Sequence, residues 1–171
     1  MTDRATVRDG AIHIERLLPG PIERVWSYIV DPDKRALWFA GGAFEQKAGG
    51  KGEFVFDHRN LSHEPTPEAW KMMEGFVSPM WVVRIEPPRL LVLGWTEGER
   101  SSELTFKLSA QGDKVLLVLR QSPVATPEDL SNYGVGWHTH LDTLQDRLEG
   151  RKPRGFWSNF ERLQKAYVQD A

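Results

Sequence analysis

The sequence contains no cysteine among its 171 residues. A disulfide framework and a thiolate metal site are therefore excluded, and the absence of cysteine suits a reducing compartment. A chain of this length buries roughly 70% of the surface that its unfolded form exposes, so one domain needs no covalent staple. We expect a single domain with a cytoplasmic location.

Long apolar runs and an excess of one charge are also missing. No stretch approaches the roughly 18 apolar residues of a membrane span, and residues 1–10 lack the apolar centre of a signal peptide. The net charge is −2, with acids and bases interspersed, and there is no basic stripe of the kind that nucleic acids require. We expect neither membrane insertion nor nucleic-acid binding.

The order of patterns along the chain predicts an α+β domain. Residues 11–18 alternate and predict a strand, and Pro21 suits the first turn of a helix. Residues 126–129 (TPED) are typical of a helix start, and Gly150 is typical of a helix end. The expected helices are 21–30, 33–38, 127–149 and 153–168, and the remaining strands are 43–48, 52–58, 77–86, 90–97, 101–109 and 113–121.

The sequence predicts a segment outside the main domain at each end of the chain. We expect a polar segment at 1–10, one domain at 11–150 and a helical extension at 151–171. A short helix with an apolar stripe is marginal in water, so we expect the extension to pack on its own domain or on a second copy in a homodimer. That stripe consists of Phe156, Trp157, Phe160, Leu163 and Tyr167.

Three stretches of the sequence form a recognisable series. The first is PIERVW at 21–26, with DP at 31–32 and WF at 38–39. The second is GGKG at 49–52, with Phe54 and Phe56, and the third is IEPPRLL at 85–91, with GW at 94–95 and at 136–137. In this order they resemble the START-like (SRPBCC) superfamily, and more closely its branch named after the activator of the heat-shock ATPase (AHSA). The resemblance covers residues 11–150.

The resemblance implies a helix-grip fold: a curved antiparallel sheet of about six to seven strands that wraps around a long C-terminal helix and encloses a cavity. Members of the superfamily include lipid carriers, hormone receptors and aromatic cyclases, so the fold alone does not select a function. The chain departs from the simplest members in the loop at 59–75 and in the helix after Gly150.

The seven tryptophans bear on the predicted cavity, because large aromatics either fill a core or line a site. In each strand one set of alternate residues faces the long helix. For each apolar residue, core packing is the alternative interpretation. Gln121 and His138 are the polar candidates. The expected lining residues are Trp38, Phe39, Phe54, Phe56, Trp81, Trp95, Phe106, Leu119, Gln121, Trp137, His138 and Leu141.

The loop at 59–68 has two prolines and no periodicity, so we expect it to be mobile and to cover the cavity mouth, with Trp70, Met72 and Met73 closing it. His58 and His63 lie near two acids, but a polar loop of this kind is more often solvated than metal-bound. The GGKG turn lies between strands, unlike a phosphate-binding loop.

These patterns predict no metal, no cofactor and no identifiable catalytic residue. The leading hypothesis is non-enzymatic binding of a small, mostly apolar or aromatic molecule in an internal cavity. Two alternatives stay open. One is an enzyme of cyclase or hydrolase type that uses the same cavity, and the other is a regulator or co-chaperone of a heat-shock ATPase, which only the name of the branch suggests.

Overall fold

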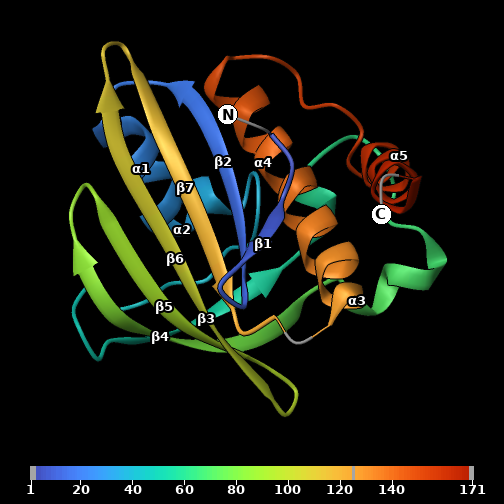
Figure 1. The fold of residues 1–171 in the computed structure, drawn as a ribbon, viewed down its shortest axis with the longest axis horizontal. Coiled ribbons are helices and arrows are strands. Elements are labelled where there is room, and N and C mark those ends of the chain that lie inside the picture. The colour runs from blue at the N-terminus through green and yellow to red at the C-terminus, as the bar shows by residue number, and fades with distance from the viewer. Residues whose placement is uncertain (1–2, 125, 170–171) are drawn as a thin grey trace.

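The computed structural model describes residues 3–124 and 126–169, and in it one antiparallel sheet curves around a long helix (Figure 1). The sheet has seven strands in the order β1-β2-β7-β6-β5-β4-β3. The α+β helix-grip prediction is therefore confirmed. The strands are β1 (Thr6–Arg8), β2 (Ala11–Pro19), β3 (Lys51–Phe56), β4 (Phe76–Glu86), β5 (Leu90–Glu97), β6 (Arg100–Gln111) and β7 (Lys114–Ser122).

The long helix is built from three consecutive segments that start at a capping box. The Thr126 Oγ1 accepts from the backbone N–H of Asp129 at 3.2 Å, and the Asp129 carboxylate accepts from the backbone N–H of Thr126 at 3.0 Å. The predicted helix start is thus confirmed. The segments are α3 (Pro127–Asp129), the π-helical η3 (Leu130–Gly134) and α4 (Val135–Leu148). Among the described residues, no helix has the length and apolarity needed to cross a membrane.

The remaining helices are short, apart from the last one. Residues 43–48, expected as a strand, instead run beside β3 and pair with it at the isolated bridge Phe44–Gly52. The helices are α1 (Ile22–Val30), α2 (Pro32–Arg35), the 3-10 helices η1 (His58–Asn60) and η2 (Glu68–Met73), and α5 (Phe156–Gln169).

Arg35 binds the backbone on both sides of α2, up to the residue before the segment 43–48. Its buried guanidinium donates to the carbonyl oxygens of Ile29 and Ala40, at 3.0 and 2.9 Å, and also to that of Gly42. The carbonyl oxygens of Ala40 and Gly42 therefore bind a side chain, whereas that of Gly41 also accepts from the backbone N–H of Val55 in β3. Sequence patterns contain no signal for such a contact.

The inner face of the sheet is as expected on β5, β6 and β7, but not on β4. There the buried residues are Ser78, Met80 and Val82, while Trp81 is 38% exposed and lies over Gly94 on the outer face. The prediction that Trp81 faces the cavity is therefore wrong. Residues 80–83 are all apolar, so alternation could not show which set of residues faces inward.

The helix α5 packs on α4, on the side away from the sheet (Figure 1). Asn159 donates to the Asp142 carboxylate at 2.9 Å, and Arg16 of β2 donates to the same carboxylate at 2.9 Å. A single buried acid therefore connects sheet, α4 and α5. Because α5 covers its apolar side within this chain, the expectation of a homodimer no longer depends on this helix.

Candidate functional site

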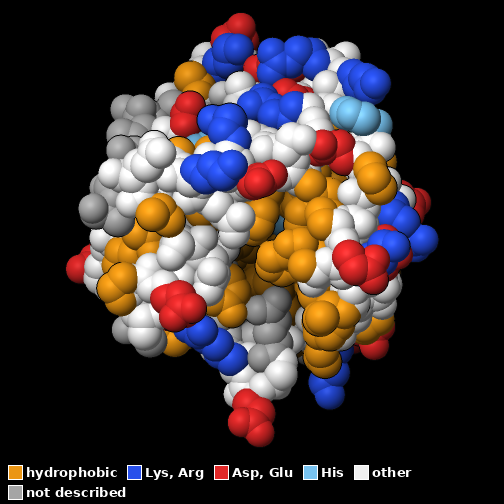
Figure 2. Space-filling view, turned by 90° about the vertical axis from the view of Figure 1, so that its right-hand side faces the viewer, with side chains coloured by type: hydrophobic (Ala, Val, Ile, Leu, Met, Phe, Trp, Pro, Cys, Tyr) orange, Lys and Arg blue, Asp and Glu red, His pale blue; other side chains and the backbone are white. Residues whose placement is uncertain are grey.

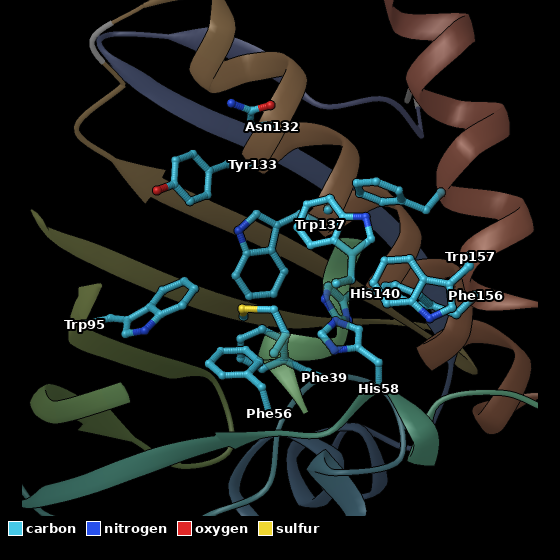
Figure 3. Close-up of a pocket in the computed structure, with 14 residues that line it drawn as sticks. Phe39, Phe56, His58, Trp95, Asn132, Tyr133, Trp137, His140, Phe156 and Trp157 are labelled. Carbon is cyan, nitrogen blue, oxygen red and sulfur yellow. The ribbon is translucent and has the colours of Figure 1, made fainter. Parts of the chain in front are cut away.

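A cavity of about 170 Å³ lies between α4, α5 and the β3–β5 end of the sheet (Figure 3). From outside, hydrophobic side chains surround a hollow on the face that carries α5 (Figure 2). Among the described residues that line it, none carries a full charge at neutral pH. The lining residues are Phe39, Phe56, His58, Trp70, Met73, Trp95, Asn132, Tyr133, Gly136, Trp137, His140, Phe156, Trp157 and Phe160.

Aromatic rings form most of the wall, and they pack against one another. The rings of Phe39 and Trp137 have their centroids 4.7 Å apart, and Phe56 stacks on Trp95 at 5.9 Å. At the α5 side, Trp70 stacks on Trp157 at 5.7 Å. Such contacts hold flat surfaces in fixed orientations, which suits a planar apolar guest.

Gln121 supports the wall from behind and does not line the cavity. Its Oε1 accepts from Trp137 Nε1 at 2.6 Å, and its Nε2 donates to the Ser102 hydroxyl at 3.0 Å. The amide therefore satisfies the indole N–H of Trp137 and sets the orientation of that ring. The sequence predicts a direct polar contact here, but the structure places Gln121 behind the wall.

Two histidines supply polar groups in this apolar wall. The Nδ1 of His140 lies 2.9 Å from the carbonyl oxygen of Trp38, which can only accept, so Nδ1 carries the proton. Burial lowers the pKa of His140 to about 3 and the pKa of His58 to about 4, although Asp57 favours the charged form of His58. Both imidazoles are therefore neutral at physiological pH.

The structure brings four of the expected residues to the cavity wall: Phe39, Phe56, Trp95 and Trp137. Trp81 lies outside the sheet, as described above. His138 faces α5, where its Nδ1 lies 3.0 Å from the Tyr167 hydroxyl, and burial lowers its pKa. The other expected residues lie buried in the surrounding core and not on the wall: Trp38, Phe54, Phe106, Leu119, Gln121 and Leu141.

Some residues of the wall lie in a different place from the one that the sequence predicts. His58 was expected in a solvated loop, yet it follows Phe54 and Phe56 in the same period of two, and that pattern could have placed it inside. Phe156 and Trp157 were expected as packing residues of the last helix. Met72, expected to help close the cavity, is 80% exposed, whereas Trp70 and Met73 line the wall.

The π-helical turn η3 contributes part of the wall that no sequence pattern indicated. Asn132 and Tyr133 lie in this turn and reach the cavity, and Gly136 follows in the first turn of α4. A Cβ atom built on Gly136 would meet no atom within 4 Å. The missing side chain therefore leaves part of the cavity open.

The chain is similar in sequence and in fold to known proteins. A sequence model of the family described as Activator of Hsp90 ATPase homolog 1-like protein matches residues 19–149. The protein encoded by gene BPP1335 of Bordetella parapertussis is 38% identical, with a TM-score of 0.83, over 96% of this chain and 88% of that chain. No curated protein matches the sequence.

More distant structures share the fold. CalU16 from Micromonospora echinospora is 25% identical, with a TM-score of 0.69, over 93% of this chain and 86% of that chain. The Aha1 dimer from Colwellia psychrerythraea is 14% identical, with a TM-score of 0.62, over 81% of this chain and 96% of that chain. At this low identity the second similarity concerns the fold alone.

Proposed function

Because the chain belongs to the Activator of Hsp90 ATPase homolog 1-like family and holds an aromatic cavity between sheet and helices, we propose that it binds a small, mostly apolar aromatic molecule there without converting it. The observation that carries this proposal is the composition of the wall. Nine of the fourteen described lining residues are Phe, Trp or Tyr, and among these fourteen Met73 is the one aliphatic side chain.

The size and the walls of the cavity both favour a ring compound over a fatty acyl chain. An apolar cavity of about 150 Å³ in another protein binds benzene, so the volume here suits a molecule of one or two rings. Aromatic walls offer flat contact surfaces on which a ring can stack or pack edge to face.

The chemistry of the wall also favours binding over catalysis. No carboxylate lies among the described lining residues, and both histidines have a pKa far below neutrality. A neutral imidazole of this kind is a poor general acid at pH 7, and as a base it is far weaker than one tuned to that pH. An enzyme of cyclase or hydrolase type would reveal itself as conversion of the bound compound.

Gly136 allows the proposal to be tested without weakening the core. The replacement Gly136→Leu starts a side chain at a Cβ position with no atom within 4 Å on the cavity wall, so we expect it to fill part of the cavity, and it gains helix propensity of about 0.8 kcal/mol. We expect the variant to melt at or above the temperature of the native protein, and to lose at least tenfold in affinity for an apolar fluorescent probe.

Two tryptophans provide matched variants for the same assay. Trp137→Leu removes a wall residue and should weaken probe binding, whereas Trp81→Leu changes the outer face and should leave it unchanged. Equal losses in both variants, or no binding of aromatic probes by the native protein, would contradict the proposal. Native mass spectrometry of freshly purified protein would identify a ligand that co-purifies.

A role as a heat-shock ATPase regulator would give a different result. In that case the native protein would retain the ATPase in a pull-down, and Gly136→Leu would leave this retention intact. Loss of probe binding together with unchanged retention would separate the two functions.

A further inference from the structure

The two nitrogen atoms of the His140 imidazole have different surroundings. Its Nδ1 lies 2.9 Å from the carbonyl oxygen of Trp38 and donates to it, because a carbonyl oxygen only accepts. Burial lowers the pKa of His140 to about 3, so at neutral pH the ring carries this single proton. The Nε2 atom therefore has a lone pair and is a hydrogen-bond acceptor.

This Nε2 atom keeps accessible surface. The described residues offer it no hydrogen-bond donor. They contain seven side-chain atoms that are both unpaired and fully buried, and Nε2 of His140 is not one of these seven. Because an unpaired atom that is not fully buried has surface that another molecule can reach, the acceptor of His140 is available to a ligand.

The accessible surface of His140 opens into the cavity. His140 lines the cavity and is only 8% exposed in total. The rings that surround it line the cavity as well, so the small surface that it retains faces the cavity and not the outer solvent (Figure 3). These rings belong to Phe39, His58, Trp137 and Phe156, and their centroids lie between 5.0 and 6.1 Å from that of His140.

A second histidine on the same helix lies in a different environment. The Nδ1 of His138 lies 3.0 Å from the Tyr167 hydroxyl, and its Nε2 lies 3.7 Å from the Asp142 carboxylate. His138 faces α5 and does not line the cavity. It therefore provides a matched control, two residues from His140, in which both ring nitrogens have polar neighbours.

The acceptor on His140 determines which ligand groups complement it. A hydroxyl or an N–H can donate to Nε2, whereas carboxylate, ketone and ether oxygens only accept and would face its lone pair. An ammonium group also donates, but no described lining residue carries the negative charge that would compensate for its lost hydration. The complementary group is therefore an uncharged donor.

We propose, as a refinement that rests on the proposed function, that the ligand is an uncharged aromatic compound with a hydroxyl or N–H group, and that the Nε2 atom of His140 accepts a hydrogen bond from this group. The aromatic rings of the wall bind the ring system of the ligand. His140 selects phenols and N–H heteroaromatic compounds over hydrocarbons and ethers of similar shape.

Three compounds with one ring frame test this refinement. Indane has no polar group, 5-methoxyindane has an oxygen that only accepts, and 5-indanol has a hydroxyl that also donates. Calorimetric titration gives their dissociation constants for each protein. The native protein should bind 5-indanol more tightly than 5-methoxyindane, because only the hydroxyl can donate to His140.

Two variants separate the acceptor from the packing of the ring. His140→Phe removes both nitrogens, whereas His140→Asn keeps an amide nitrogen on Cγ that can donate to Trp38 and removes the acceptor at Nε2. In both, the affinity for 5-indanol relative to indane should fall about fivefold, the value of one hydrogen bond, and that for 5-methoxyindane relative to indane should not change. In the control His138→Phe both ratios should equal those of the native protein.

Nitrogen NMR tests the acceptor without any substitution. In the native protein the His140 ring should be protonated at Nδ1 and not at Nε2, and the Nε2 resonance should move more when 5-indanol binds than when indane binds. If the compounds bind, a proton on Nε2 or unchanged ratios in both His140 variants would show that the refinement is wrong, and the proposed function stands. If none of the three compounds binds the native protein, the proposed function fails, and the refinement fails with it.

Discussion

Gln121 illustrates how one polar side chain controls the shape of an apolar site. Its Oε1 accepts a hydrogen bond from the indole N–H of Trp137 at 2.6 Å, and its Nε2 donates one to the Ser102 hydroxyl. Without this acceptor the indole would carry an unpaired buried donor and would be free to change its orientation. The residue is therefore a positioning residue for the cavity wall.

We expect Gln121→Leu to lower the free energy of unfolding by about 1–3 kcal/mol, because the Trp137 N–H loses its acceptor. Urea unfolding measures this change, and probe titration should show weaker binding. Ser102→Ala is the control, since it leaves the acceptor of the indole in place and should cost less. Equal stability of Gln121→Leu and the native protein would show that the hydrogen bond does not hold the ring.

At the scale of elements, α5 has two roles in the same molecule. It covers α4 through Asn159 and Tyr167, and it contributes Phe156, Trp157 and Phe160 to the cavity wall. Hydrogen bonds from Arg154 to Asp146, at 2.9 and 2.8 Å, fix the turn that leads into the helix. Packing of α5 and formation of the site are therefore coupled.

Deletion of residues 153–171 should lower the melting temperature and abolish probe binding. The truncation removes one wall of the cavity and leaves Asp142 and Asp146 without several of their donors. Thermal unfolding and probe titration of the shortened chain measure both effects. A shortened chain that melts and binds like the native protein would show that α5 contributes neither stability nor contacts.

The 3-10 helix η2 contributes to the cavity wall but has few packing contacts that would hold it in place. Its Trp70 is 40% exposed and its Met72 is 80% exposed, and a short 3-10 helix has poor hydrogen-bond geometry. We expect amide hydrogens of residues 59–73 to exchange faster than those of β6 and β7 in the empty protein, and to slow when a probe is bound. If the amide hydrogens of residues 59–73 exchange as slowly as those of β6 and β7 when no probe is bound, this segment does not open and close over the cavity mouth.

For the whole molecule, the buried histidines predict acid sensitivity. Burial lowers the pKa of His58 to about 4 and that of His140 to about 3, whereas an unfolded histidine titrates near 6.5. Between these values the unfolded chain binds more protons than the folded chain, so stability is fully present above pH 6.5 and falls as the pH decreases toward 4.

Each of the two histidines should contribute about 1.4 kcal/mol per pH unit to this loss. Urea unfolding at several pH values between 4.5 and 7.5 measures the slope, and His58→Phe should reduce it by the share of one histidine. An unchanged slope in this variant would mean that the pKa of His58 is the same in the folded and the unfolded protein.

The sequence by itself determined the elements and most of the inner face of the sheet. Alternation in β6 and β7 placed Phe106, Leu119 and Gln121 inside, and the TPED motif located the start of the long helix. These features depend on residues that lie close together in the sequence, so local sequence patterns predict them.

Only the tertiary structure decided which side chains form the wall. Trp81 and Met80 are both apolar neighbours in β4, and pairing with β5 decided that Met80 faces inward. His140, and not His138, reaches the cavity because α5 covers the other side of α4. The cavity wall joins residues from Phe39 to Phe160, and contacts over such separations depend on how whole elements pack, a property that no local periodicity records.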